Sequence, residues 1–234
     1  MSVNVGLIDS GVNPWHSHVQ GVEGGIAFHL GPKGEVVHDS DFRDEIGHGT
    51  ALAGIIREHV PRVKLHAIKI FHRTLEAPLP LLFAALEWAI KQNMNVINLS
   101  LGTERKQARA RLRTLCQQAY DQGIVIVAAA QAPDHQVFPS VFETVIGVYW
   151  NHSCDRDSLI YHPGSLIEFG AYGRPRDLPH MPPLMNFSGS SFATAYVTAK
   201  VVRLLEINPG AGVSGVKEAL QKGAISVPFP ADDQ

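Results

Sequence analysis

Three segments of the sequence place an acid, an imidazole and a hydroxyl beside glycine and other small residues. Asp9 follows VGLI and precedes SGV, His48 lies in GHGTALAGI, and Ser191 lies in NFSGSSFATA. Taken singly, such an Asp is typical of a turn, such a His of a surface, and such a Ser of a helix N-cap. Taken together, in the order Asp, His, Ser, they are the groups that nucleophilic catalysis by a serine hydroxyl requires.

The elements that must position these groups follow from the hydrophobic pattern. Short β-branched runs alternate with longer helical patterns, which predicts a parallel sheet in a doubly wound α/β domain. Strands are expected at residues 3–9, 63–71, 96–101, 124–130 and 145–149. Helices are expected at residues 49–59, 79–92, 105–121, 191–206 and 213–222. The carboxyl ends of such strands meet at one edge of the sheet, where we expect the chemistry.

Composition limits the classes of protein to consider. The chain has 234 residues, 45% of them hydrophobic and 18% charged, which is typical of a globular protein. A formal charge of −2 gives no indication of nucleic acid or an anionic membrane as a partner. The N-terminus shows no signal peptide pattern, so we expect a cytoplasmic protein. Cys116 and Cys154 lack metal or redox spacing, and two free thiols are favoured over one disulfide.

The motifs resemble those of the subtilase family of serine peptidases. DSGVNP is similar to its Asp motif, GHGTALAGII to its His motif HGT-x-x-AG, and GSSFATA to its Ser motif GTS-x-A. The order Asp, His, Ser is that of subtilisin. EWAIKQNMNVINLSLG resembles the family's helix and substrate-binding strand, and IVIVAAA followed by FPSV resembles its oxyanion region. The resemblance implies one subtilisin-like domain over residues 1–234, without a prosegment, in three layers with helices on both faces of a mainly parallel sheet.

The resemblance also implies roles for the three residues. Ser191 would attack the peptide carbonyl to form an acyl-enzyme, and His48 would take its proton and deliver it to the leaving amine. Asp9 would fix the tautomer of His48 and stabilise the imidazolium. The backbone N–H of Ser191 would face the developing oxyanion. Ser190 is the rival nucleophile, but it occupies the position where the family usually has Thr.

Substrate contacts are implied at two strand ends. The segment Ser100, Leu101 and Gly102 would pair with an extended peptide as an added strand. Residues 128–130 would form one wall of the family's first specificity pocket, and Ala130 and Ala132 are candidate substrate contacts. Both segments are equally consistent with ordinary buried strands, and the two interpretations are compatible.

Several departures from the family pattern bear on function. Ala132 replaces the Asn that normally donates to the oxyanion, so Gln131 is the first candidate for a substitute donor, with protonated Asp134 another. The segment 132–138 is shorter than the family's pocket loop. The calcium-binding loop after the His helix is missing, because residues 57–61 lead straight into the next strand. We therefore expect no metal and no cofactor.

Two other polar clusters allow a functional and an ordinary interpretation. The acidic residues before His48 form either a rim for basic substrates or a polar loop, and the polar loop is favoured. They are Asp39, Asp41, Asp44 and Glu45. His16 and His18 suit a surface loop better than a metal site.

The sequence therefore favours a serine endopeptidase, specialised for a precursor peptide. Its partner is a peptide or protein substrate, with no expected nucleic acid or membrane. The alternative is a weakly active or inactive peptide-binding scaffold, which Ala132 favours and the intact triad disfavours. Acyl or peptidyl transfer by the same triad ranks last, because no feature of the sequence excludes water.

Overall fold

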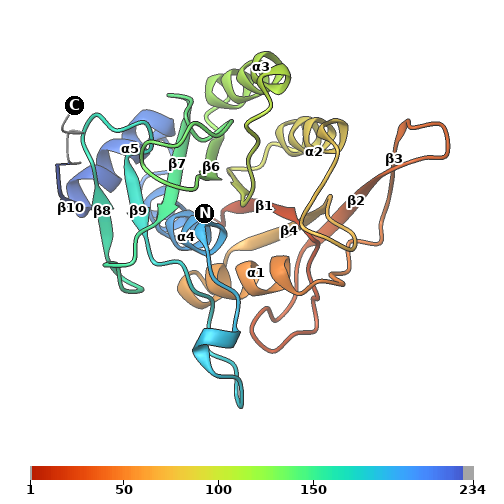
Figure 1. Ribbon diagram of the computed structural model, residues 1–234, viewed down its shortest axis with the longest axis horizontal. Helices are drawn as coiled ribbons and strands as arrows, with labels where there is room; N and C mark the ends of the chain where they lie inside the picture. The colour runs from red at the N-terminus through yellow and green to blue at the C-terminus, as the bar shows by residue number, and fades with distance from the viewer. Residues whose placement is uncertain (1, 229–234) are drawn as a thin grey trace.

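The computed structural model describes residues 2–228, which build one ten-stranded sheet in the order β10-β8-β9-β7-β6-β5-β1-β4-β2-β3 (Figure 1). The strands are Asn4–Asp9 (β1), Gly24–Leu30 (β2), Val36–Asp39 (β3), Lys64–Lys69 (β4), Val96–Leu99 (β5), Val125–Ala129 (β6), Val145–Trp150 (β7), Leu159–Tyr161 (β8), Phe169–Ala171 (β9) and Ile225–Ser226 (β10). The helices are His48–His59 (α1), Leu79–Lys91 (α2), Arg109–Asp121 (α3), Ser190–Ile207 (α4) and Gly212–Gly223 (α5), with 3₁₀ turns at Lys106–Ala108 (η1) and Pro183–Met185 (η2).

The strand order of the sheet reverses beside β1. The chain places β4 and β2 on one side of β1, and β5, β6 and β7 on the other, all of them parallel. Among the strands that the structure describes, the antiparallel pairs lie toward the edges, between β2 and β3 and between β8 and β9. Crevices form at the carboxyl ends of strands where the strand order reverses. Asp9, the last residue of β1, lies at this point.

Two hydrophobic cores cover the two faces of the sheet. On one face α2 and α3 pack against side chains such as Ile97 and Ile126. On the other face α1, α4 and α5 pack against side chains such as Val5 and Val127. Figure 1 shows the same arrangement, with α2 and α3 on the opposite side of the sheet from α1 and α4. Burial on both faces explains the continuous apolar runs and confirms the predicted three-layer α/β fold.

The predicted central strands and all five predicted helices are present, with shifts at their ends. The strands β2, β3, β8, β9 and β10 were not predicted. Apart from the seven-residue β2 they have two to four residues, and β3 and β10 are largely exposed, so they carry little hydrophobic pattern. The helix predicted at 105–121 begins at Arg109, after the 3₁₀ turn η1.

Both cysteines are free and buried, as favoured from the sequence. Burial raises the pKa of the Cys116 thiol to about 12, which keeps it protonated and unreactive. None of the helices within residues 2–228 is long and apolar enough to cross a membrane.

Candidate active site

The segment after β1 turns sharply and meets the start of α1. Asp9 is fully buried, and its Oδ1 accepts a hydrogen bond of 2.8 Å from the backbone N–H of Ser10. Gly11 has φ +92°, and a Cβ there would overlap the carbonyl oxygen of Phe42. A Cβ at Gly49 would likewise overlap the carbonyl oxygen of Gly11. Gly49 therefore allows the backbone of α1 to lie directly on the Asp9 segment, and Gly11 allows that segment to lie against the loop at Phe42.

His48, the first residue of α1, contacts Asp9 directly. Its Nδ1 lies 2.7 Å from Asp9 Oδ1, and only 5% of the residue is exposed. The rings of Phe187 and Phe192 meet the imidazole edge to face, with centroids 5.8 and 5.2 Å away. Burial alone would lower the pKa of His48, but the charge and hydrogen bond of Asp9, together with the charge of Asp44, raise it above its ordinary value.

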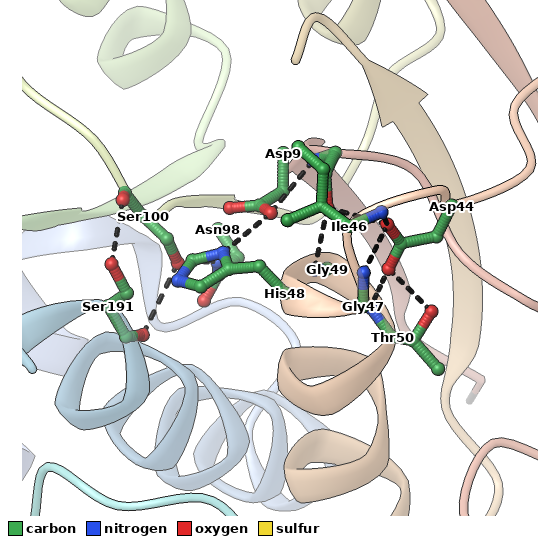
Figure 2. A network of polar contacts seen from close by, with 11 residues as sticks. Asp9, Asp44, Ile46, Gly47, His48, Gly49, Thr50, Asn98, Ser100 and Ser191 are labelled. Atoms are coloured by element: carbon green, nitrogen blue, oxygen red, sulfur yellow. Dashed lines mark hydrogen bonds and ion pairs between the residues drawn. The ribbon is translucent and has the colours of Figure 1, made fainter. Parts of the chain in front are cut away.

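Ser191 lies in the first turn of α4, after Gly189 with φ +140°. Figure 2 shows the imidazole of His48 between Asp9 and Ser191. The Ser191 hydroxyl donates a hydrogen bond of 3.0 Å to the carbonyl of Ser100. The neighbouring Ser190 is engaged elsewhere, since its Oγ accepts a hydrogen bond of 3.0 Å from the N–H of Trp150 in β7. Ser190 Oγ is thus bonded to β7, whereas Ser191 Oγ is bonded to the residue that follows β5.

A buried polar chain that sequence reasoning missed holds Ser100 beside Ser191. The Oγ1 of Thr198 in α4 donates to Asn98 Oδ1 at 2.8 Å, and Asn98 Nδ2 donates to Ser100 Oγ at 2.7 Å. Ser100 Oγ in turn donates to the carbonyl of Ser191 at 3.3 Å. The available signal was Asn98 itself, a fully buried amide in the apolar strand VINL.

The predicted oxyanion and pocket residues lie at the ends of β5 and β6. Gln131 is exposed and Ala132 is half-buried. The Gln131 amide is therefore accessible next to Ala132, which stands where the family has its Asn donor. Ala130 is only 3% exposed and packs with Tyr149 and Ile167. A pocket wall at Ala130 would therefore consist mainly of backbone.

The predicted substrate strand borders a cavity of about 680 Å³. Leu101, Gly102 and Thr103 form one side of it, and the start of α2, with Leu79 and Leu82, contributes the other. A second cavity of about 330 Å³ lies beside His48 and is lined by Gly47, Met185 and Phe187 among others. The site is thus flanked by two recesses with apolar residues in their walls.

Among the histidines and acidic residues singled out in the sequence, Asp44 differs from the others in its contacts. His16 and His18 lie with ring centroids 5.0 Å apart, and the described part of the chain holds no group of three His, Cys, Asp or Glu suited to a metal ion. Asp41 is exposed and pairs with Arg43 at 2.6 Å, as expected of a polar loop. Asp44 is different, because its carboxylate is bonded to the loop and the first turn of α1.

Residues 1–135 match the family model of the Subtilase family. The chain belongs to the subtilase family. This confirms the expected family of subtilisin-like serine peptidases.

Curated relatives align with the whole subtilase chain. It is 25% identical over 246 residues to the minor extracellular protease Epr of Bacillus subtilis (strain 168), covering 100% of this chain and 36% of Epr. It is 26% identical over 247 residues to subtilisin DY of Bacillus licheniformis, covering 97% of this chain and 85% of that protein. Subtilisin E of Bacillus subtilis (strain 168) is 27% identical, and the match covers 95% of this chain and 60% of that protein. The chain thus spans less than two thirds of the length of Epr and of subtilisin E.

Solved structures share the fold of this subtilase. A lanthipeptide protease superposes with a TM-score of 0.74 at 20% identity, over 99% of this chain and 82% of that chain. A cold adapted subtilisin-like serine proteinase gives a TM-score of 0.73 at 20% identity, over 98% and 89%. These similarities confirm the subtilisin-like α/β fold.

Proposed function

We propose that this subtilase hydrolyses peptide bonds through a triad of Asp9, His48 and Ser191. The observation that carries the proposal is the 2.7 Å contact between the buried Asp9 and His48, with Ser191 beside the same ring. A hydrogen on Nδ1 bonded to Asp9 leaves the lone pair of Nε2 free to accept a proton. Family membership supports this assignment of roles.

In the proposed reaction the Ser191 hydroxyl leaves the Ser100 carbonyl for the His48 ring when a substrate binds. Catalytic hydrogen bonds often tighten only in the substrate complex. As Oγ bonds to the peptide carbon, its proton passes to Nε2, and the same proton goes to the leaving nitrogen as the C–N bond breaks. Water then attacks the acyl-enzyme and gives a proton to Nε2. That proton returns to Ser191 Oγ as the acyl bond breaks and the acid leaves. The N–H of Ser191, in the first turn of α4, stabilises the oxyanion.

The specialised part of the proposal is a cytoplasmic peptidase that processes a precursor peptide. The structural similarity to a lanthipeptide protease supports it, as do the two free cysteines, which suit a reducing compartment. Ala132 removes the usual oxyanion donor, so remote contacts must contribute more to positioning the substrate. The two recesses beside the site offer surface for such contacts.

A fluorophosphonate probe tests the triad. We expect one labelled residue, Ser191, with labelling abolished in Ser191→Ala and retained in Ser190→Ala. Labelling that survives Ser191→Ala would contradict the assignment. A folded protein that takes no label but binds peptides would instead support the scaffold alternative. Two observations favour that alternative, namely the bond between Ser191 Oγ and the Ser100 carbonyl and the presence of Ala132.

Substrate breadth tests the specialised role. We expect slow digestion of casein compared with subtilisin DY at equal enzyme concentration, and much faster cleavage of one member of a library of precursor peptides. Casein digestion at the rate of subtilisin DY would count against a processing role while leaving the triad intact.

A further inference from the structure

Asp44 lies four residues before His48 in the loop that enters α1, and five hydrogen bonds hold its carboxylate (Figure 2). The donors are Ser10 Oγ, Ile46 N, Gly47 N, Thr50 N and Thr50 Oγ1, at distances of 2.6–2.9 Å. A carboxylate bonded this extensively is locked in one orientation.

Asp44 takes over the role of a helix cap at α1. The residue in the N-cap position is Gly47, with φ 91° and no side chain to accept a bond from the first turn. Asp44 accepts from the N–H groups of Gly47 and Thr50 instead, and its negative charge faces the positive end of the helix dipole. The first turn of α1 carries His48, so Asp44 holds the backbone from which the imidazole projects.

Asp44 is also connected to Asp9, the residue that contacts His48. Ser10 Oγ donates to Asp44 at 2.9 Å and accepts from the N–H of Gly49 at 2.9 Å. The backbone N–H of the same Ser10 donates to Asp9 Oδ1 at 2.8 Å. A continuous set of short bonds therefore runs from Asp44 through Ser10 to Asp9, and from Asp44 to the turn that carries His48.

We propose that Asp44 is a positioning residue, which joins the Asp9 segment to the first turn of α1 through Ser10 and so sets the contact between His48 and Asp9. The proposal rests on the proposed triad. Asp44 does not touch the reacting atoms. It acts through His48, whose displacement by about 1 Å would cost on the order of 10²-fold in rate.

Asp44 has an electrostatic effect on His48 as well. Burial lowers the pKa of His48, and the negative charges of Asp9 and Asp44 raise it. Phe192 from α4 and Phe187 from the preceding loop face the ring without charge. The cavity that Asp44 borders is also lined by three basic side chains, those of His16, His18 and Arg176. Removing the charge of Asp44 should therefore ease deprotonation of the His48 imidazolium.

The test compares Asp44→Asn with Ser10→Ala, using Asp41→Asn as the matched control. Asp41 is an exposed acid of the same loop, paired with Arg43. For Asp44→Asn we expect kcat to fall about 10-fold or more with KM within about twofold, and the acid limb of kcat/KM to move to lower pH. Ser10→Ala keeps the charge, so kcat should fall without that shift of the limb. Asp41→Asn should change neither.

The outcomes separate this inference from the proposed function. Wild-type kcat and an unshifted acid limb in Asp44→Asn would overturn the positioning role. If Asp44→Asn fails to fold, Ser10→Ala decides, and wild-type kcat in that variant overturns the proposal. Activity that survives Ser191→Ala would instead refute the triad itself. If the activity of Asp44→Asn falls only in proportion to its folded fraction, and the acid limb does not move, Asp44 is only structural.

Discussion

At the scale of single residues, His48 combines a buried position with an adjacent negative charge. Its Nδ1 lies 2.7 Å from Asp9 Oδ1, and a hydrogen held between them leaves Nε2 to exchange a proton. The raised pKa of His48 strengthens it as a base, but it also means that more of the ring is protonated near neutral pH.

This raised pKa predicts the pH dependence of activity. Only the neutral imidazole can accept the Ser191 proton, so kcat/KM should fall as the pH drops, with a midpoint above the ordinary His value of about 6.5. For stability the sign is opposite, because the charged pair stabilises the fold below about pH 6.5 and that contribution is lost as the pH rises through the raised pKa. A pH profile with peptide substrate checks the first statement, and a midpoint below 6.5 would contradict it.

A second residue-scale prediction concerns the oxyanion donor near Ala132. In subtilisin, loss of one such side-chain donor costs about 10²–10³ in kcat. We expect Gln131→Ala to lower kcat by up to that factor with little change in KM, because the donor acts only in the transition state. Ala132→Asn should then leave kcat nearly unchanged. A gain in kcat for Ala132→Asn, with no loss for Gln131→Ala, would show that the donor is missing altogether.

At the scale of elements, the site depends on the close approach of α1 to the end of β1 and of α4 to the end of β5. The first approach is made by backbone at Gly11 and Gly49, without side chains between. The second is held by the polar chain from Thr198 through Asn98 to Ser100. Both helices pack against the same face of the sheet, so His48 and Ser191 share one rigid platform.

The first approach predicts a large effect of one methyl group. Gly49→Ala would place a Cβ on the carbonyl oxygen of Gly11, and α1 must move away from Asp9 to relieve the overlap. We expect a loss of about 1–3 kcal/mol in the free energy of unfolding and a large fall in kcat. Gly223→Ala in α5 is the matched control, because a Cβ there meets nothing within 4 Å. Denaturant unfolding and kinetics measure both variants, and equal behaviour of the two would contradict the packing argument.

At the scale of the whole molecule, stability comes from two hydrophobic cores, one on each face of a ten-stranded sheet. The chain enters β4 from α1 by a short turn, in which Val60 N–H bonds to the Ile56 carbonyl and Val63 N–H to the Val60 carbonyl. This is the turn at which the resemblance implies that the family's calcium-binding loop is missing. Both of these backbone N–H groups are bonded within the chain.

We predict that folding and activity do not require calcium. Calcium binds through six to eight oxygen ligands, and the described residues provide no cluster of three candidate side chains. Adding a chelator should leave Tm and kcat/KM unchanged. A drop in Tm that calcium restores would reveal a site formed in another way.

The sequence by itself determined the central strands and the helices, and it predicted the three motif residues. Asp9, His48 and Ser191 each lie within two residues of a glycine, at the end of a strand or the start of a helix. These local patterns are readable because their partners are the next few residues. The apolar runs of β1, β5 and β6 are readable for a related reason, since burial on both faces demands them.

Only the tertiary structure decided which polar groups serve the site. Ser10 and Asp44 are 34 residues apart, and Asn98 and Thr198 are 100 apart. As a result the sequence presented Asp44 as one of several loop acids, indistinguishable from the exposed Asp41. Four of its five bonds come from residues 46–50, but the bond from Ser10 joins distant segments where Gly49 lets α1 lie on the turn after β1. A contact between distant segments leaves no periodic trace in either one.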